Sequence, residues 1–198
     1  MRFTRAELEA YRGHRVDDLI GPNLKLLFVG INPGLWTAAV ATHFAHPTNR
    51  FYPALALAGI TEHEVDRVAG MTAADRAQLT ARGVGITNLV PLATARASEL
   101  SRAELQEGGE RLLRFVAEHR PRVVAIAGVT ANREAFGIRG AVLGRQPETL
   151  DSAQRWSGAA LWVVPNPSGL NAHETVETLA AAYAAPAAEA GIIVQPDV

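Results

Sequence analysis

The strongest constraint on the fold is a set of four short, mainly apolar runs separated by longer segments. The runs cover residues 24–29, 84–90, 123–127 and 161–164, and Gly or Pro follows each of them closely. Apolar runs of this length, bounded by turn residues, are typical of strands that are buried on both faces of a parallel sheet. The sequence therefore predicts four such strands.

The segments between these runs have the periodicity of helices, over residues 49–58, 73–82, 101–119 and 130–136. Ser101 and Glu104 form a capping box at the start of the third helix, and Pro121 follows its end. Strands that alternate with helices predict βαβ units. We therefore expect an α/β fold, a three-layer α/β/α sandwich around a small, mostly parallel four-stranded sheet.

Length and residue usage favour a single domain over residues 1–198. We expect a core over about residues 24–184, a final helix over 173–183 that ends near Pro186, and a loose tail over 187–198. The chain has no cysteine, which excludes disulfides, a thiolate nucleophile and thiolate metal sites. Residues 1–9 do not resemble a signal peptide, and no run is long enough to span a membrane. We expect a cytoplasmic monomer with no membrane partner.

Ligands of open α/β sheets bind beyond the carboxyl ends of the strands, and the loop after the first strand is unusual there. It reads Gly30-Ile31-Asn32-Pro33-Gly34. Pro33 restricts Asn32 to extended geometry, and the glycines allow a ligand to approach the backbone closely. The alternative is an ordinary tight turn, for which the same residue types are common.

The loop after the fourth strand, residues 165–171, is a second stiff turn. It places Leu170 behind Gly169, where an apolar side chain can enter a base stack and fill the space of a flipped nucleotide. The alternative is a leucine that packs on its own core.

A polar and aromatic cluster, His43-Phe44-Ala45-His46-Pro47-Thr48-Asn49-Arg50-Phe51, leads into the first predicted long helix. Phe44 is suited to stacking on a planar base. His43 and His46 also suggest a metal site, but no acidic residue lies near them in the sequence, so we predict no metal ion.

These three motifs together resemble the mismatch-specific uracil-DNA glycosylases, the relatives of thymine-DNA glycosylase within the uracil-DNA glycosylase superfamily. The resemblance extends over about residues 24–183 and includes Gly85-Ile86-Thr87-Asn88-Leu89-Val90 and Glu107-Gly108-Gly109. It implies the uracil-DNA glycosylase fold, no metal and no cofactor.

The resemblance also implies roles for individual residues. Asn32 would position the attacking water, Phe44 would stack on the base, and Leu170 would be the wedge. Gly30, Ile31, Gly34 and Asn166 would also contact the base, and Ser168, Gly169, Asn171 and His173 would contact DNA. Two positions depart from the family pattern: Ala172 stands in place of an arginine, and Trp36 stands in place of a small residue. We expect Trp36 to pack on the neighbouring helix. Glu99 is a weak candidate for assisting catalysis.

The implied function is a monofunctional glycosylase of base excision repair. It would flip uracil from G·U mismatches in double-stranded DNA, with other damaged pyrimidines left open, and hydrolyse the N-glycosidic bond to leave an abasic site. The net charge of −1 means that a local patch would have to hold the DNA. The alternatives are a non-catalytic mismatch or nucleotide binding module and a small-molecule hydrolase, although the chain lacks a GxSxG motif.

Overall fold

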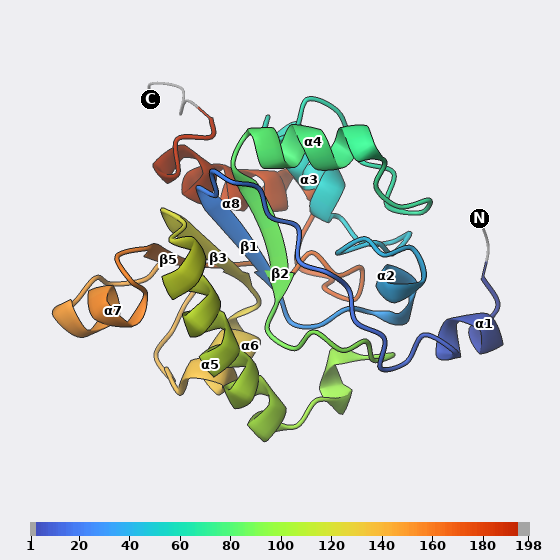
Figure 1. Ribbon diagram of the computed structural model, residues 1–198, viewed down its shortest axis with the longest axis horizontal. Coiled ribbons are helices and arrows are strands. Elements are labelled where there is room, and N and C mark those ends of the chain that lie inside the picture. The colour runs from blue at the N-terminus through green and yellow to red at the C-terminus, as the bar shows by residue number, and fades with distance from the viewer. Residues whose placement is uncertain (1–2, 194–198) are drawn as a thin grey trace.

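A computed structural model describes residues 3–193, which form a five-stranded sheet in the order β2-β1-β3-β5-β4 (Figure 1). The strands are β1 (Leu26–Gly30), β2 (Val84–Asn88), β3 (Val123–Ala127), β4 (Gly144–Arg145) and β5 (Ala160–Val164). The four predicted strands are present and all run parallel, whereas β4 pairs antiparallel with β5 at the edge. Two residues are too few to give a periodic signal, so β4 was not predicted.

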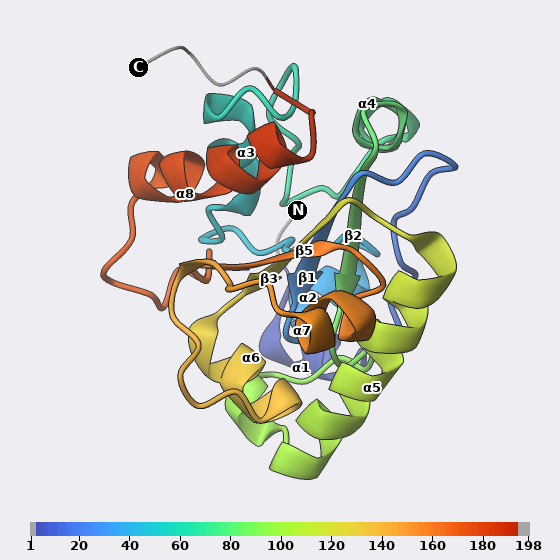
Figure 2. The same ribbon diagram turned by 90° about the vertical axis from the view of Figure 1, so that its left-hand side faces the viewer.

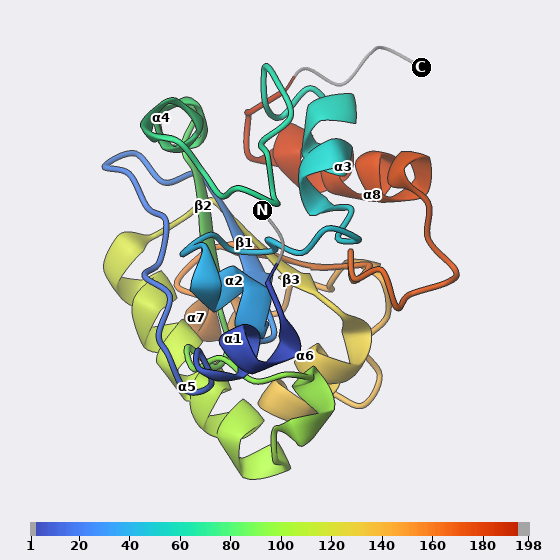
Figure 3. The ribbon, with the colours of Figure 1, turned by 90° about the vertical axis from the view of Figure 1, so that its right-hand side faces the viewer.

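Helices cover both faces of the sheet, as Figures 2 and 3 show. One face carries α3 (Phe51–Leu57), α4 (Ala73–Ala81) and α8 (Val176–Glu189), and the other carries α5 (Arg102–His119), α6 (Val129–Phe136) and α7 (Leu150–Arg155). Alternate residues of β1 point into the two cores: Leu26 and Phe28 into the first, Leu27 and Val29 into the second. This confirms the predicted α/β/α sandwich.

The two glycines of α5 bring this helix close to its neighbours. A Cβ at Gly108 would lie 2.7 Å from the Leu89 carbonyl oxygen, and one at Gly109 would lie 2.7 Å from the Ala135 carbonyl oxygen. A side chain at Gly108 would push α5 away from the segment that follows β2, and one at Gly109 would push it away from α6. The glycine pair therefore supports the edge of the sheet at which the candidate site lies.

The last helix, α8, continues three residues beyond Pro186, where the sequence predicted its end. A proline inside a helix costs about 3 kcal/mol, but Ala187 and Ala190 are buried against the first core, and this packing offsets the cost. Of the predicted tail, residues 194–198 lie outside the described range. Within residues 3–193, no helix combines the length and the apolar character that crossing a bilayer requires.

Four short helices were also not predicted: α1 (Arg5–Glu9), α2 (Leu35–Ala39), α7 and the 3-10 helix η1 (Ala97–Glu99). Each is held by caps or by contacts distant in sequence. In α1, Thr4 and Glu7 form a capping box, and Arg12, which follows the helix, pairs with Glu99 of η1 at 2.5 Å. Of these elements, α2 and η1 contribute lining residues to the candidate site, Thr37 and Ala97.

Candidate active site

A cavity of about 310 Å³ opens at the carboxyl ends of the parallel strands, where the sequence analysis placed the ligand. Nine predicted site residues line it: Gly30, Ile31, Asn32, Gly34, Phe44, Asn166, Ser168, Gly169 and Leu170. Asn171 and His173 do not line it. Asn171 stabilises the loop from within, since its Nδ2 donates to the Asn166 carbonyl at 3.0 Å, while His173 is exposed beyond the loop.

Asn32 is held in one orientation by two acceptors. The Thr94 hydroxyl donates its only proton to the Arg96 carbonyl at 2.8 Å, so towards Asn32 it can only accept. The Asn32 Nδ2 donates to this hydroxyl at 2.8 Å and to the Pro33 carbonyl at 3.0 Å. Its Oδ1 has no hydrogen-bond partner among the described residues and stays accessible to solvent. An acceptor oxygen therefore faces the cavity.

Asn88, at the end of β2, supplies a second oriented amide that the sequence analysis did not select. The Nε2 of His43 faces the Asp17 carbonyl at 3.0 Å, and a carbonyl only accepts, so this nitrogen carries the proton. Burial lowers the pKa of His43, which keeps the ring neutral and leaves Nδ1 as an acceptor. The Asn88 Nδ2 donates to it at 2.9 Å.

The Oδ1 of Asn88 consequently points away from His43 and towards Gly30. Gly30 and Asn88 are direct neighbours in the parallel ladder, and a Cβ at Gly30 would lie only 2.3 Å from this oxygen. Asn88 Oδ1 has no partner in the described part of the chain and is not sealed from solvent. The signal that identifies Asn88 in the sequence is a polar amide at the carboxyl end of a buried strand.

Phe44 forms one wall of the cavity. Its ring stacks on Phe51 of α3 with centroids 4.1 Å apart, and its backbone adopts φ 55°, in the left-handed region that non-glycine residues rarely occupy. A Cβ at Gly30 would come within 3.2 Å of the Phe44 ring. Gly30 therefore keeps open the space between this ring and Asn88.

The loop of residues 165–171 is ordered by its own polar groups. The Ser168 N–H donates to Asn166 Oδ1 at 2.9 Å, which orients the third amide and leaves its Nδ2 with no acceptor among residues 3–193. Gly169 packs on Thr48, where a Cβ would meet the threonine side chain at 2.3 Å. Leu170 projects outward and is 91% exposed, so the core-packing alternative is wrong.

The remaining candidates have structural partners. His46 also lines the cavity, and its Nδ1 accepts from the Thr48 N–H at 3.2 Å, whereas His43 orients Asn88. The described residues contain no cluster of three His, Asp or Glu suited to a metal. Glu99 lies outside the cavity, where it accepts from the Arg96 N–H at 3.0 Å, and its pairing with Arg12 lowers its pKa. Trp36 has the packing role that the sequence analysis favoured, since its ring contacts the Phe3 ring edge-on with centroids 4.9 Å apart.

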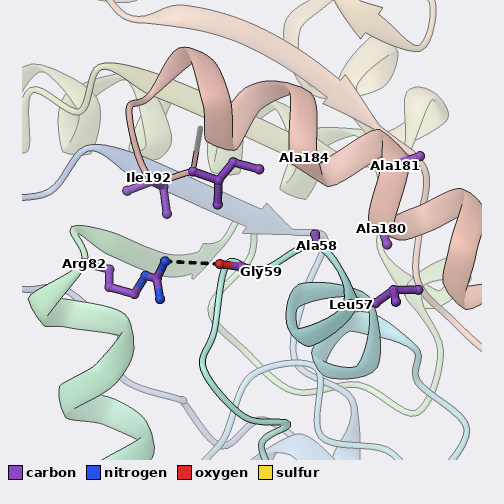
Figure 4. A pocket seen from close by; sticks show the side chains of 9 residues that line it. Leu57, Ala58, Gly59, Arg82, Ala180, Ala181, Ala184 and Ile192 are labelled. Atoms are coloured by element: carbon purple, nitrogen blue, oxygen red, sulfur yellow. Dashed lines mark hydrogen bonds between the residues drawn. The ribbon is translucent and has the colours of Figure 1, made fainter. Parts of the chain in front are cut away.

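A second cavity, of about 620 Å³, lies far from these residues between α3, α8 and the chain after α8 (Figure 4). Its walls are alanine, leucine and isoleucine side chains. Arg82 is the one charged residue among the described residues that line it, and it donates to the Gly59 carbonyl at 3.1 Å. This cavity contains no predicted site residue and offers no group for chemistry.

The three oriented amides lie within a chain segment that also matches a known family. The family model described as "Uracil DNA glycosylase superfamily" matches residues 18–186, which include all five strands and every residue of the first cavity.

Proposed function

The chain belongs to the uracil DNA glycosylase superfamily, and on that premise we propose that this DNA glycosylase excises uracil from G·U mismatches in double-stranded DNA. The observation that carries the proposal is the cavity itself, which presents the amide oxygens of Asn32 and Asn88, the Asn166 Nδ2 and an aromatic wall, and which has no carboxylate among its described lining residues. Such a site can recognise a neutral base and orient water. Within residues 3–193 it has no carboxylic acid to protonate a poor leaving group, and burial lowers the pKa of its one histidine, His46, which disfavours the protonated imidazole.

The oriented amides match the edge of uracil. Uracil has one N–H donor, at N3, between two carbonyl oxygens, and we assign Asn88 Oδ1 as the acceptor for N3–H. Asn166 Nδ2 is the donor for a carbonyl oxygen, and Phe44 stacks on the ring. Neutral cytosine has no hydrogen on N3, so its lone pair would face the Asn88 oxygen. The arrangement therefore selects uracil-type bases over cytosine.

Hydrolysis needs a water molecule on the face of C1′ opposite the base. We assign Asn32 Oδ1 as the acceptor that orients this water, because its Nδ2 is already committed to Thr94 and Pro33. The C1′–N1 bond breaks with its electron pair passing to N1 of uracil, and the water oxygen bonds to C1′. An amide does not accept the released proton, which passes to bulk water. Rates should be modest, and uracil is a suitable leaving group because its anion is comparatively stable.

The preference for mismatches is assigned to the flipping step. A mispaired base costs less to extrude than a paired one, and Leu170 is exposed at the cavity mouth, where it can occupy the vacated stack. G·U pairs should therefore be processed faster than A·U pairs. Action in the cytoplasm as a monomer stays part of this proposal.

Labelled duplexes carrying G·U, A·U, G·T or an etheno-cytosine pair, followed by alkaline cleavage of abasic sites, test the proposal. The expected order is G·U above A·U, with the other two pairs defining the base range. Equal rates on G·U and A·U would contradict the mismatch preference. The alternative, a binding module, predicts that the Asn32→Ala variant behaves like the wild type and that neither releases uracil.

A further inference from the structure

Arg50 connects the two loops of the cavity by an unusual set of hydrogen bonds. It precedes α3, and its Nη2 donates to the carbonyls of Ser168 at 2.7 Å and Asn171 at 2.6 Å, while Nη1 donates to the Glu174 carbonyl. Its backbone N–H donates to the Pro167 carbonyl at 3.0 Å. One residue thus binds four carbonyls of residues 167–174, here named the wedge loop.

This use of an arginine differs from the usual ones. Arg50 is half-buried, its Nε is buried without a partner, and it forms no ion pair within residues 3–193. Its planar group presents several N–H donors in fixed directions, and here they bind the backbone of the wedge loop, which leaves them unable to bind a DNA phosphate at the same time. Partial burial of an unpaired charge costs free energy, so the hydrogen bonds that Arg50 makes must offset this cost.

We infer that Arg50 is a positioning residue that holds the wedge loop in the shape that projects Leu170, and that it couples this loop to the segment carrying Phe44. The wedge loop contains no helix or strand, and its internal hydrogen bonds alone do not fix it to the body of the protein. A loose loop would have to be ordered each time the leucine entered DNA, and this entropy loss would weaken flipping. Gly169 packed on Thr48 provides a second contact with the same segment.

The inference rests on the proposed function, and it predicts a larger effect on duplex DNA than on single strands. The Arg50→Lys variant keeps the charge but cannot reach all the carbonyls, so single-turnover excision from a G·U duplex should fall by about tenfold. Excision from single-stranded uracil should fall less, by no more than about threefold, because there is no stack to enter and the wedge loop contributes there only the Ser168 N–H that orients Asn166. Arg133→Lys is the matched control, since Arg133 is also half-buried and donates to a backbone carbonyl, that of Ala141 at 2.7 Å, away from the cavity.

A double-mutant cycle with Leu170→Ala separates positioning from general support of the fold. If Arg50 acts through the wedge, Arg50→Lys should have little further effect on duplex excision once Leu170 is truncated. Equal losses on single and double strands, or a full Arg50→Lys effect in the Leu170→Ala background, would overturn the inference. Wild-type protein that releases uracil from neither substrate would instead refute the proposed function.

Hydrogen exchange gives a readout that does not depend on activity. The amides of the wedge loop should exchange faster in Arg50→Lys than in Arg133→Lys or the wild type, and unchanged exchange would refute the inference. If Arg50→Lys does not fold, Gly169→Ala serves in its place, because its Cβ would meet the Thr48 carbonyl at 2.9 Å and displace the wedge loop. It should show the same larger loss on duplex DNA and the same dependence on Leu170.

Discussion

Truncation of Leu170 tests the link between the exposed wedge and the preference for mismatches. The side chain is 91% exposed in the free protein, so Leu170→Ala removes no core contact and should leave the melting temperature unchanged. If the side chain becomes buried in the vacated stack, the part that alanine lacks contributes about 2 kcal/mol. This corresponds to about a 30-fold loss of single-turnover excision from a G·U duplex.

The assay compares duplex G·U with single-stranded uracil on the same preparation. Single-stranded excision should stay within about twofold, because no stack has to be entered. Leu150→Ala is the control: Leu150 begins α7 and is 85% exposed, but lies outside the cavity. An equal loss on both substrates, or a similar loss in Leu150→Ala, would refute the reasoning.

The other predictions concern the amides, the buried histidine and metals. Asn32→Ala should lower excision by about 100-fold or more with duplex affinity within a few-fold, and near wild-type excision would remove Asn32 from the mechanism. Thr94→Val should cost about fivefold and Thr94→Ser should restore the rate, since one hydrogen bond of about 1 kcal/mol orients Asn32; equal rates in both variants would exclude this role. His43 has a pKa lowered by burial, so the unfolded chain binds its proton first. The free energy of unfolding should therefore fall as pH drops below about 6.5, by up to about 1.4 kcal/mol per pH unit, with a smaller slope in His43→Gln as measured by urea titration. Excision should persist in excess chelator, and activity that returns only with a divalent ion would contradict the site assignment.

The layered fold was predictable because its signal is local. Buried parallel strands and amphipathic helices each leave a period in the sequence, and all four parallel strands and four of the intervening helices lie where these periods predicted. The elements that were missed span only two to six residues, too few to show a period, and some of them depend on distant partners. The pairing of Arg12 with Glu99 is an example, since 87 residues separate the two.

The candidate site was predictable in its residue types but not in its orientations. Asn32, Phe44 and Asn166 stand in motifs at strand ends, so the sequence indicates them directly. Which atom of an amide faces the ligand depends on partners 62 residues away for Asn32 and 45 residues away for Asn88. No local pattern records such pairs. The same holds for Arg50, which in the sequence is one arginine among many.

The pairing of His43 with Asn88 also limits how the base range of this enzyme can be redesigned. Substituting Asn88 alone leaves a neutral imidazole beneath it that accepts a hydrogen bond, so a new side chain must still donate to that nitrogen. A variant intended to recognise cytosine needs an N–H group facing the cavity. The first substitution should therefore be at His43, to a residue that donates a hydrogen bond to Asn88 Oδ1. The Asn88 amide would then rotate so that its Nδ2 faces the cavity. Engineering from beneath the cavity would change what the site recognises while its lining residues stay the same.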